Sequence, residues 1–571
     1  MAVILFHMGY LINGYLGVDI FFVISGFLII NIIYKESKIN AFTIFNFYIR
    51  RIRRIIPLVL FISIAALIIG IFVMLPDDLE NLSESVIATN FFANNILLLI
   101  TSVNYWSIVN EFKPLMHTWS LGVEEQFYLI IPFLFIAFKN KQNSPILFIL
   151  IIFSILSFTA FIFSNNNAHT FYLLQFRFFE LSFGGIGAIL SNKIKVKSSL
   201  STLFLFSILF ILFVNISIPS KLLTVLIVIL TIGILITPNP NKINKLLLEN
   251  KFMLYVGLIS FSLYMWHQVI LAYTKYCLNN TPNFLQYIFI LIIIFILSIF
   301  TYKFIENPFR NKLVINNKKF IIISLSFFTL IISLSSYIYL NMGIVRNIPE
   351  LDIYKYNLHR SVFGNISNDD NSYKKKYQIY NERVYSYNKN FISNEKYKIL
   401  IIGNSFARDF ANILLESNIN DKIEISYTDN IKNCNDFTLK KEAANYILFD
   451  DLDYVDYKNN ISNYNIDSSK IKIIGIKNFG MNNGVYYIRR FFNDYYAQKI
   501  VIKSSILKSN NDLKNIYKNS YIDLINVISD DKKKIPIFTP NHKFISHDGM
   551  HLTEAGSIFY ASKLDLKSIF N

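Results

Sequence analysis

The chain has 571 residues, of which 53% are hydrophobic and 16% are aromatic. This apolar fraction is too high for an ordinary soluble protein, so the composition indicates a membrane protein. The net charge of +17 does not point to a nucleic-acid partner, because much of it lies in short loops between apolar runs, where it sets membrane orientation. The two cysteines, Cys277 and Cys434, lie far apart in the sequence and form no metal or redox motif, so we expect no metal site.

The composition changes near residue 340. Apolar residues are concentrated before that point, and Asn, Lys, Asp and Tyr dominate after it. We therefore predict a polytopic α-helical membrane domain over 1–340, a polar linker or extension over 341–395, and a soluble α/β domain over 396–571. The last of these is long enough to bury a core of its own.

The membrane domain contains about eleven candidate spans, at 1–12, 17–34, 55–75, 119–138, 145–164, 171–191, 198–216, 221–237, 254–275, 284–304 and 319–340. A further apolar run, 86–103, is ambiguous. The loop 35–54 and the loops after residues 138, 191, 237 and 304 are rich in Lys and Arg, and the alternate loops are poor in both. Because basic loops stay in the cytoplasm, this pattern is consistent only if 86–103 does not fully cross. We therefore expect a re-entrant or interfacial segment there and a C-terminal domain outside the cytoplasm.

A polar face interrupts the apolar pattern at the start of the segment 119–138. A spacing of three or four residues places His117, Ser120, Glu124 and Tyr128 on one side of the predicted helix. The adjacent acids Glu124 and Glu125 are costly at the mouth of a membrane-length apolar segment unless they face a partner or water. This face is therefore a candidate functional site. For Glu125, hydrogen bonding between helices is an equal alternative.

Other polar residues lie inside or beside the predicted spans. A neutral imidazole deep in an apolar helix, such as that of His7, can act as a general base near neutral pH. Arg177 and Glu180 are one helical turn apart, and we expect them to form a structural ion pair. Taken alone, the Arg50–Arg54 cluster is most simply a topology signal.

The soluble domain opens with a buried strand, 398–402, which runs into Gly-Asn-Ser and then a helix. Such a junction can expose the hydroxyl of Ser405 beside backbone N–H groups. Asp548 and His551 stand three residues apart near the C-terminus, so the three residues have the composition of a nucleophilic triad. Further strand candidates at 423–427, 446–449 and 471–476 predict a parallel sheet covered by helices. The alternative is that Ser405 only caps a helix and His551 is a surface residue.

Seven stretches of the membrane half resemble the acyltransferase-3 family of integral membrane O-acyltransferases, in family order: 5–7, 17–29, 50–57, 117–128, 177–187, 260–268 and 304–310. The resemblance implies an acyl-CoA donor, usually acetyl-CoA, used from the cytoplasmic side. It also implies that His7 is the essential membrane histidine and that Arg51, Arg53 and Arg54 are candidates to hold the CoA phosphates. The family places a basic residue eleven positions before its histidine, which this chain lacks, so we expect a misassigned start or a truncated chain.

The soluble domain resembles the SGNH hydrolase fold, whose opening motif is usually Gly-Asp-Ser; here Asn404 replaces the acid. The stretch 521–524 also fits a late strand of that fold. That resemblance implies an oxyanion hole built from a glycine and an asparagine in the middle of the domain. Gly480, Asn482 and Asn483 are the candidates, and the backbone N–H of Ser405 is the safer donor.

A fusion of these two domains resembles bacterial enzymes that O-acetylate cell-surface glycans. The resemblance implies a multi-pass protein of the bacterial plasma (inner) membrane, surrounded by lipid, that passes an acyl group from acyl-CoA to Ser405 and on to a sugar hydroxyl. Lipopolysaccharide O-antigen is the first expected acceptor, and peptidoglycan, capsule and exopolysaccharide stay open. Two other classes also stay open: a glycan esterase that uses the same triad, and a non-enzymatic export partner with a polar pathway in its membrane half.

Overall fold

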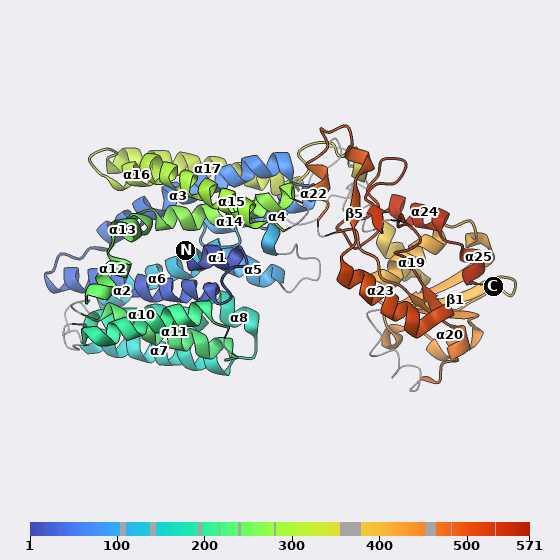
Figure 1. Cartoon of the computed structure of the whole chain (residues 1–571), viewed down its shortest axis with the longest axis horizontal. Coiled ribbons are helices and arrows are strands. Elements are labelled where there is room, and N and C mark those ends of the chain that lie inside the picture. Colours follow the sequence, from blue (N-terminus) through green and yellow to red (C-terminus); the bar gives the residue numbers. More distant parts are fainter. Residues whose placement is uncertain are drawn as a thin grey trace. The chain divides into compact units, whose positions relative to one another are not determined.

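The structure is a computed structural model that describes residues 1–102, 110–137, 144–191, 197–215, 217–237, 241–278, 281–353, 379–450, 464–480, 482–531 and 533–570. The chain divides into two compact units (Figure 1). The helical unit comprises Met1–Phe72 and Asp78–Tyr339, and the α/β unit comprises Val73–Asp77 and Leu340–Asn571.

The helical unit is built from apolar helices. Within the described residues, seven of its helical stretches are long and apolar enough to cross a membrane, or eight if a pair bent by 67° counts as one span. Long apolar helices satisfy their own backbone hydrogen bonds, as a lipid environment requires. The helices are α1 (Ala2–His7), α2 (Gly17–Lys38), α3 (Ile44–Val73), α4 (Pro76–Asn90), α5 (Asn94–Ser102), α6 (Thr118–Ala137), α7 (Ser144–Phe163), α8 (Asn167–Tyr172), α9 (Leu174–Leu190), α10 (Ser198–Phe213), α11 (Ser220–Leu235), α12 (Lys242–Leu248), α13 (Lys251–Leu258), α14 (Ser260–Cys277), α15 (Phe284–Thr301), α16 (Asn307–Arg310) and α17 (Asn317–Leu340).

Two predicted segments differ from a simple span. The segment 1–12 is not a span-length helix, because α1 has six residues and a turn and a short 3-10 helix separate it from α2. The run 86–103 is divided between α4 and α5, with Phe92 at a positive φ of 53° in the break. Asn94 is buried after this break, and its side-chain amide donates to the Leu115 carbonyl at 2.9 Å. The run 86–103 therefore forms no continuous helix, while the membrane crossings by the other ten predicted segments stay predictions.

Helices α2 and α9 pack closely against each other. A Cβ on Gly26 would lie 1.8 Å from the Leu181 carbonyl oxygen, so only glycine permits this approach. Beside this contact, Arg177 Nη1 lies 2.7 Å from both Asp19 Oδ1 and Glu180 Oε1. The predicted Arg177–Glu180 pair is therefore confirmed, and Asp19 of α2 joins it.

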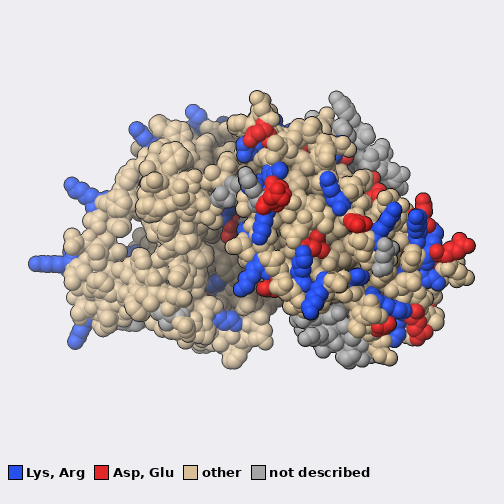
Figure 2. Space-filling model, turned by 45° about the vertical axis from the view of Figure 1, so that its right-hand side comes forward, with Lys and Arg blue, Asp and Glu red and all other residues tan. Residues whose placement is uncertain are grey.

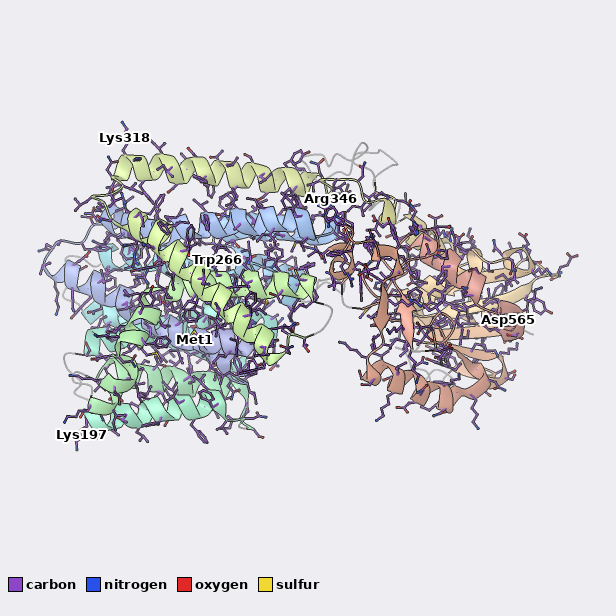
Figure 3. The ribbon with its side chains drawn as sticks, turned by 45° about the horizontal axis from the view of Figure 1, so that its top comes forward. Met1, Lys197, Trp266, Lys318, Arg346 and Asp565 are labelled. Carbon is purple, nitrogen blue, oxygen red and sulfur yellow. The ribbon has the colours of Figure 1, made fainter. Side chains whose placement is uncertain are left out.

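Charged side chains are distributed differently on the two units. Acidic and basic side chains are spread over the α/β unit, whereas the visible face of the helical unit is largely uncharged (Figure 2). Lys197 and Lys318 lie at the same end of the helical unit (Figure 3). They come from two of the loops predicted to be cytoplasmic; residues 138–143 and 192–196 of the other basic loops lie outside the described residues.

The α/β unit contains a five-stranded parallel sheet in the order β2-β1-β3-β4-β6. Both faces of its strand β1 are buried: Ile399 and Ile401 pack in one apolar cluster, and Leu400 and Ile402 in another. The strands are β1 (Tyr397–Ile402), β2 (Ile423–Thr428), β3 (Tyr446–Asp450), β4 (Ile471–Ile474) and β6 (Tyr521–Ile522), with β5 (Lys499–Val501) and β7 (Lys534–Pro536) as a separate antiparallel pair. The helices are α19 (Ser405–Leu415), α20 (Phe437–Ala443), α22 (Gly484–Tyr487), α23 (Ser504–Tyr517), α24 (Glu554–Lys563) and α25 (Leu566–Ile569).

The predicted strands at 398–402, 423–427 and 446–449 are confirmed. The strands predicted at 471–476 and 521–524 are present but shorter, as β4 ends at Ile474 and β6 at Ile522. The parallel sheet is confirmed with them. Residues 354–378, which belong to the predicted linker, lie outside the described residues.

Candidate functional site

The turn between β1 and α19 positions Ser405 as the first residue of the helix. Gly403 has a φ of 146°, and a Cβ there would lie 2.6 Å from Asp450 Cγ. The backbone N–H of Asn404 donates to Asp450 Oδ2 at 2.8 Å. The Asn404 side-chain oxygen accepts from the Phe406 N–H at 3.0 Å, so Asn404 caps the helix. The alternative in which Ser405 is the cap is therefore wrong.

The structure brings Ser405, His551 and Asp548 into one hydrogen-bonded chain. Ser405 Oγ lies 2.9 Å from His551 Nε2, and His551 Nδ1 lies 2.6 Å from Asp548 Oδ2. An ionised carboxylate can only accept, so Nδ1 carries the proton and Nε2 presents its lone pair to the serine hydroxyl. This is the arrangement of a nucleophile, a general base and an orienting acid.

The carboxylate of Asp548 is held in its ionised form. The backbone N–H groups of Met550 and His551 donate to Asp548 Oδ1 at 2.9 and 2.8 Å. Burial opposes ionisation, but the hydrogen bonds and positive charge offered by His551 outweigh it and hold the pKa of Asp548 well below its ordinary value. Asp548 therefore can orient the imidazole and stabilise its protonated form without taking the proton itself.

Asp409 links the serine helix to the loop of the histidine. It lies on α19, four residues after Ser405, and its Oδ2 accepts the backbone N–H of Leu552 at 2.9 Å. Lys477 Nζ lies 3.0 Å from the same oxygen and 3.5 Å from the centre of the Phe406 ring. Burial lowers the pKa of Lys477, and the nearby Asp409 opposes that shift. This pair was not predicted from the sequence. The position of Asp409, four residues after Ser405, could have indicated that its side chain lies on the same face of the helix as Ser405.

The three mid-domain candidates for the oxyanion hole have other partners. The Asn483 amide donates to the carbonyls of Ser546 and His547 at 2.7 and 2.9 Å, which uses both of its N–H groups. Asn482 Oδ1 accepts from the Gly484 N–H at 2.6 Å, and the Gly480 N–H donates to Asn478 at 3.1 Å.

These contacts correct the expectation for Asn483, which secures the loop before Asp548 instead of offering a free donor. The Ser405 N–H stays the predicted donor, because N–H groups in the first turn of a helix lack an acceptor within the helix.

In the helical unit, the predicted polar face of α6 is buried. His117, Ser120, Glu124 and Tyr128 are each at most 6% exposed. Glu124 accepts hydrogen bonds from the hydroxyls of Ser25 and Tyr128. Glu124 thus has partners on its own helix and on α2.

The neighbouring Glu125 and Arg51 are different. Glu125 is half-buried, and its Oε1 has no hydrogen-bond partner among the described residues. Arg51 has its guanidinium 5.8 Å from the centre of the Tyr128 ring, and its buried Nε also lacks a partner within the described ranges. Polar atoms without a hydrogen-bond partner are typical of side chains that bind a charged or polar group.

Arg53 is already engaged by the protein. Its guanidinium donates to the carbonyls of Phe309 and Ile315, each at 2.7 Å, and to Asn317 Oδ1 at 2.9 Å. The side chain is thereby used to hold the segment before α17, and Arg51 and Arg54 are the better candidates for a phosphate group. His7 ends α1, where its ring lies beside Phe6 and His267.

Comparison with known proteins identifies the family of the helical unit. The model of the acyltransferase-3 family, described as an acyltransferase domain, matches residues 1–303. The chain belongs to this acyltransferase family. The match and the names of the relatives below support an O-acyltransferase, and the long apolar helices support a multi-pass membrane protein.

Three relatives illustrate the range of similarity. An uncharacterized protein of Haemophilus influenzae is 38% identical over 246 residues, which is 39% of this chain and 99% of that protein. A putative O-acetyltransferase of Staphylococcus aureus is 29% identical, over 55% of this chain and 56% of the relative. A peptidoglycan O-acetyltransferase of Listeria monocytogenes is 28% identical, over 55% of each. The chain thus spans about half the length of the last two relatives. No solved structure matches the chain.

Proposed function

We propose that this acyltransferase moves an acetyl group from cytoplasmic acetyl-CoA to a hydroxyl of a cell-surface glycan outside the cytoplasm. The observation that carries the proposal is the Ser405–His551–Asp548 chain, which lies in the α/β unit of a protein whose helical unit belongs to the acyltransferase-3 family. A nucleophilic serine on the same chain as a membrane acyltransferase domain supports a relay of the acyl group. We assign the α/β unit to the SGNH-hydrolase-like class.

In the helical unit, His7 acts as a base for the donor half of the reaction. Arg51 and Arg54 bind the CoA phosphates through charge-assisted hydrogen bonds. Glu124 and Glu125 belong to the acyl-transfer path. Acyl-CoA supplies the activated thioester carbonyl, and these residues bind and orient it.

In the α/β unit, Ser405 Oγ attacks the incoming acyl carbonyl while His551 Nε2 takes the hydroxyl proton. His551 then gives this proton to the leaving group, and an acyl-serine remains. A sugar hydroxyl attacks that ester, His551 accepts its proton, and Ser405 regains a proton as the glycan ester leaves. Asp548 keeps the imidazole in the tautomer that both steps need.

Two acceptors are compared in the test. Lipopolysaccharide O-antigen is the acceptor that the domain arrangement favours. Peptidoglycan is the second, because the Listeria monocytogenes relative is named a peptidoglycan O-acetyltransferase. A glycan esterase is the competing activity, since water could replace the sugar at the same acyl-serine.

The deciding experiment supplies labelled acetyl-CoA to inside-out membrane vesicles and measures label in the O-antigen and peptidoglycan fractions. Ser405→Ala should reduce glycan-bound acetyl by about 10³-fold or more, because the nucleophile is lost. Ser504→Ala is a matched control, since Ser504 is also the first residue of a helix in the α/β unit and is exposed. Unchanged glycan acetylation in Ser405→Ala would rule out the relay. Release of free acetate with no glycan label would favour the esterase.

A further inference from the structure

Three histidine side chains form a cluster inside the helical unit. His7 ends α1, His117 precedes α6, and His267 lies on α14. Figure 3 labels Trp266, the residue just before His267 on that helix. The ring centre of His267 lies 5.5 Å from that of His7 and 5.2 Å from that of His117. His267 and His117 are 0% and 3% exposed. The middle ring thus contacts both others away from solvent.

The contacts of His267 determine its neutral tautomer. Its Nδ1 lies 2.5 Å from the backbone carbonyl oxygen of Tyr264. A carbonyl oxygen only accepts, so Nδ1 carries the proton and Nε2 carries a lone pair. This Nε2 is buried and has no hydrogen-bond partner among the described residues. His267 therefore presents a fixed, unprotonated nitrogen inside the unit.

His117 is held by its backbone, while its ring has no hydrogen-bonding partner. The Tyr264 hydroxyl lies 2.8 Å from the His117 carbonyl oxygen and 2.6 Å from Ser120 Oγ. Both ring nitrogens of His117 are buried and without a partner within the described ranges. Buried polar atoms normally find hydrogen bonds, and leaving several unpaired in one place is typical of a site that binds a polar group.

A metal ion does not account for the cluster. Within the described residues, no group of three or more His, Cys, Asp or Glu side chains is placed to hold one. Hydrogen bonds among the three rings do not account for the cluster either, because none joins these histidines within the described residues. The cluster suits a reacting group that releases a proton, because His267 Nε2 is a fixed acceptor between two further imidazoles.

We propose that His7, His267 and His117 form one proton-transfer site, in which His267 Nε2 receives the proton released during acyl transfer. This inference rests on the proposed function, because it assigns the site to an acyl thioester and a hydroxyl acceptor. In the helical unit, the oxygen of the hydroxyl that first accepts the acyl group, ahead of Ser405, bonds to the acyl carbon, and its proton passes by way of His7 to His267 Nε2. The carbon–sulfur bond breaks, and the thiolate takes the proton back as a free thiol. His117 hydrogen-bonds the reacting group and holds it between the other two rings.

The test compares His267→Asn with wild type in native membrane vesicles supplied with acetyl-CoA, and measures the release of free CoA thiol. Asparagine can keep a donor to the Tyr264 carbonyl, but it lacks the nitrogen at the Nε2 position. The rate should fall by about 10²-fold or more with little change in KM. His169→Asn is the control, because His169 is an exposed histidine of the same unit. Imidazole added to His267→Ala should restore part of the rate, which a merely structural role would not allow.

The outcomes separate this inference from the proposed function. If His7→Asn is inactive while His267→Asn and His117→Asn keep the wild-type rate, the three-histidine site is wrong and the proposed function stands. If His7→Asn also keeps the wild-type rate, the assigned donor half of the proposed function is wrong as well. If His267→Asn loses thermal stability as well as activity, and imidazole restores nothing to His267→Ala, His267 is a packing residue and the inference is overturned.

Discussion

At the scale of single residues, Asp409 couples the helix of Ser405 to the loop of His551. One carboxylate oxygen accepts the Leu552 N–H and faces the Lys477 ammonium, and both charged side chains are 1% exposed. The free-energy cost of removing two charges from water offsets much of the attraction between them, so such a buried pair adds little to the stability of the fold. Its contribution is geometric, because it fixes the backbone beside His551.

The pair predicts different effects for single and double substitutions. Asp409→Ala leaves the Lys477 ammonium buried and unpaired, and it should lower the free energy of unfolding by about 3 kcal/mol. Asp409→Leu combined with Lys477→Met removes both charges at similar volume and should restore most of that stability. The double variant should still transfer acetyl about tenfold more slowly, because the Leu552 N–H loses its acceptor. Thermal unfolding and acetyl-transfer rates of the purified chain measure the two effects.

The exposed Arg489–Asp494 pair is the control, with its side chains 42% and 60% exposed. Asp494→Asn should change neither stability nor rate, since exposed ion pairs contribute little. If the Asp409→Leu, Lys477→Met double variant transferred acetyl at the wild-type rate, Asp409 would not position the backbone beside His551.

At the scale of elements, the β1–α19 turn determines where the serine points. Buried β1 ends at Ile402, and Gly403 then takes a backbone conformation that other residues rarely adopt. Asp450, the last residue of the neighbouring strand β3, accepts the Asn404 N–H and closes the turn. The nucleophile is therefore set by two adjacent parallel strands together.

Gly403→Ala tests this turn. A Cβ there would meet the Asp450 carboxyl at 2.6 Å, in addition to the cost of the positive φ. The substitution should lower the free energy of unfolding by about 2 kcal/mol and reduce acetyl transfer. Gly257→Ala in α13 is the control, because a Cβ at that position would meet nothing within 4 Å. Chemical denaturation and transfer assays on both variants give the comparison, and a neutral Gly403→Ala would contradict the account of the turn.

At the scale of the whole molecule, the charge pattern predicts that the α/β unit lies outside the cytoplasm and the basic loops lie inside. Lys508 is an exposed residue of α23, and Lys197 is an exposed residue of a basic loop. In a Cys277→Ser, Cys434→Ser background, Lys508→Cys should react with a membrane-impermeant maleimide on intact spheroplasts. Lys197→Cys should react only after permeabilisation. Labelling in the reverse order would overturn the orientation.

The division near residue 340, most of the apolar helices, the parallel strands and the residues of the serine, histidine and aspartate chain could be predicted from the amino-acid sequence. These features depend on local composition, on hydrophobic periodicity and on short motifs, which are legible along the chain. The segment 1–12 was the exception, since an apolar run does not reveal where a helix stops.

Other polar partnerships became visible only in the folded protein. Arg53 is engaged by Asn317, Asn483 by the loop before Asp548, and Asp409 by Lys477. The cluster of His7, His117 and His267 joins three segments separated by more than a hundred residues each. Hydrogen bonds and ion pairs of this kind depend on distances of a few ångströms between remote segments, and those distances arise only when the helices and strands pack together.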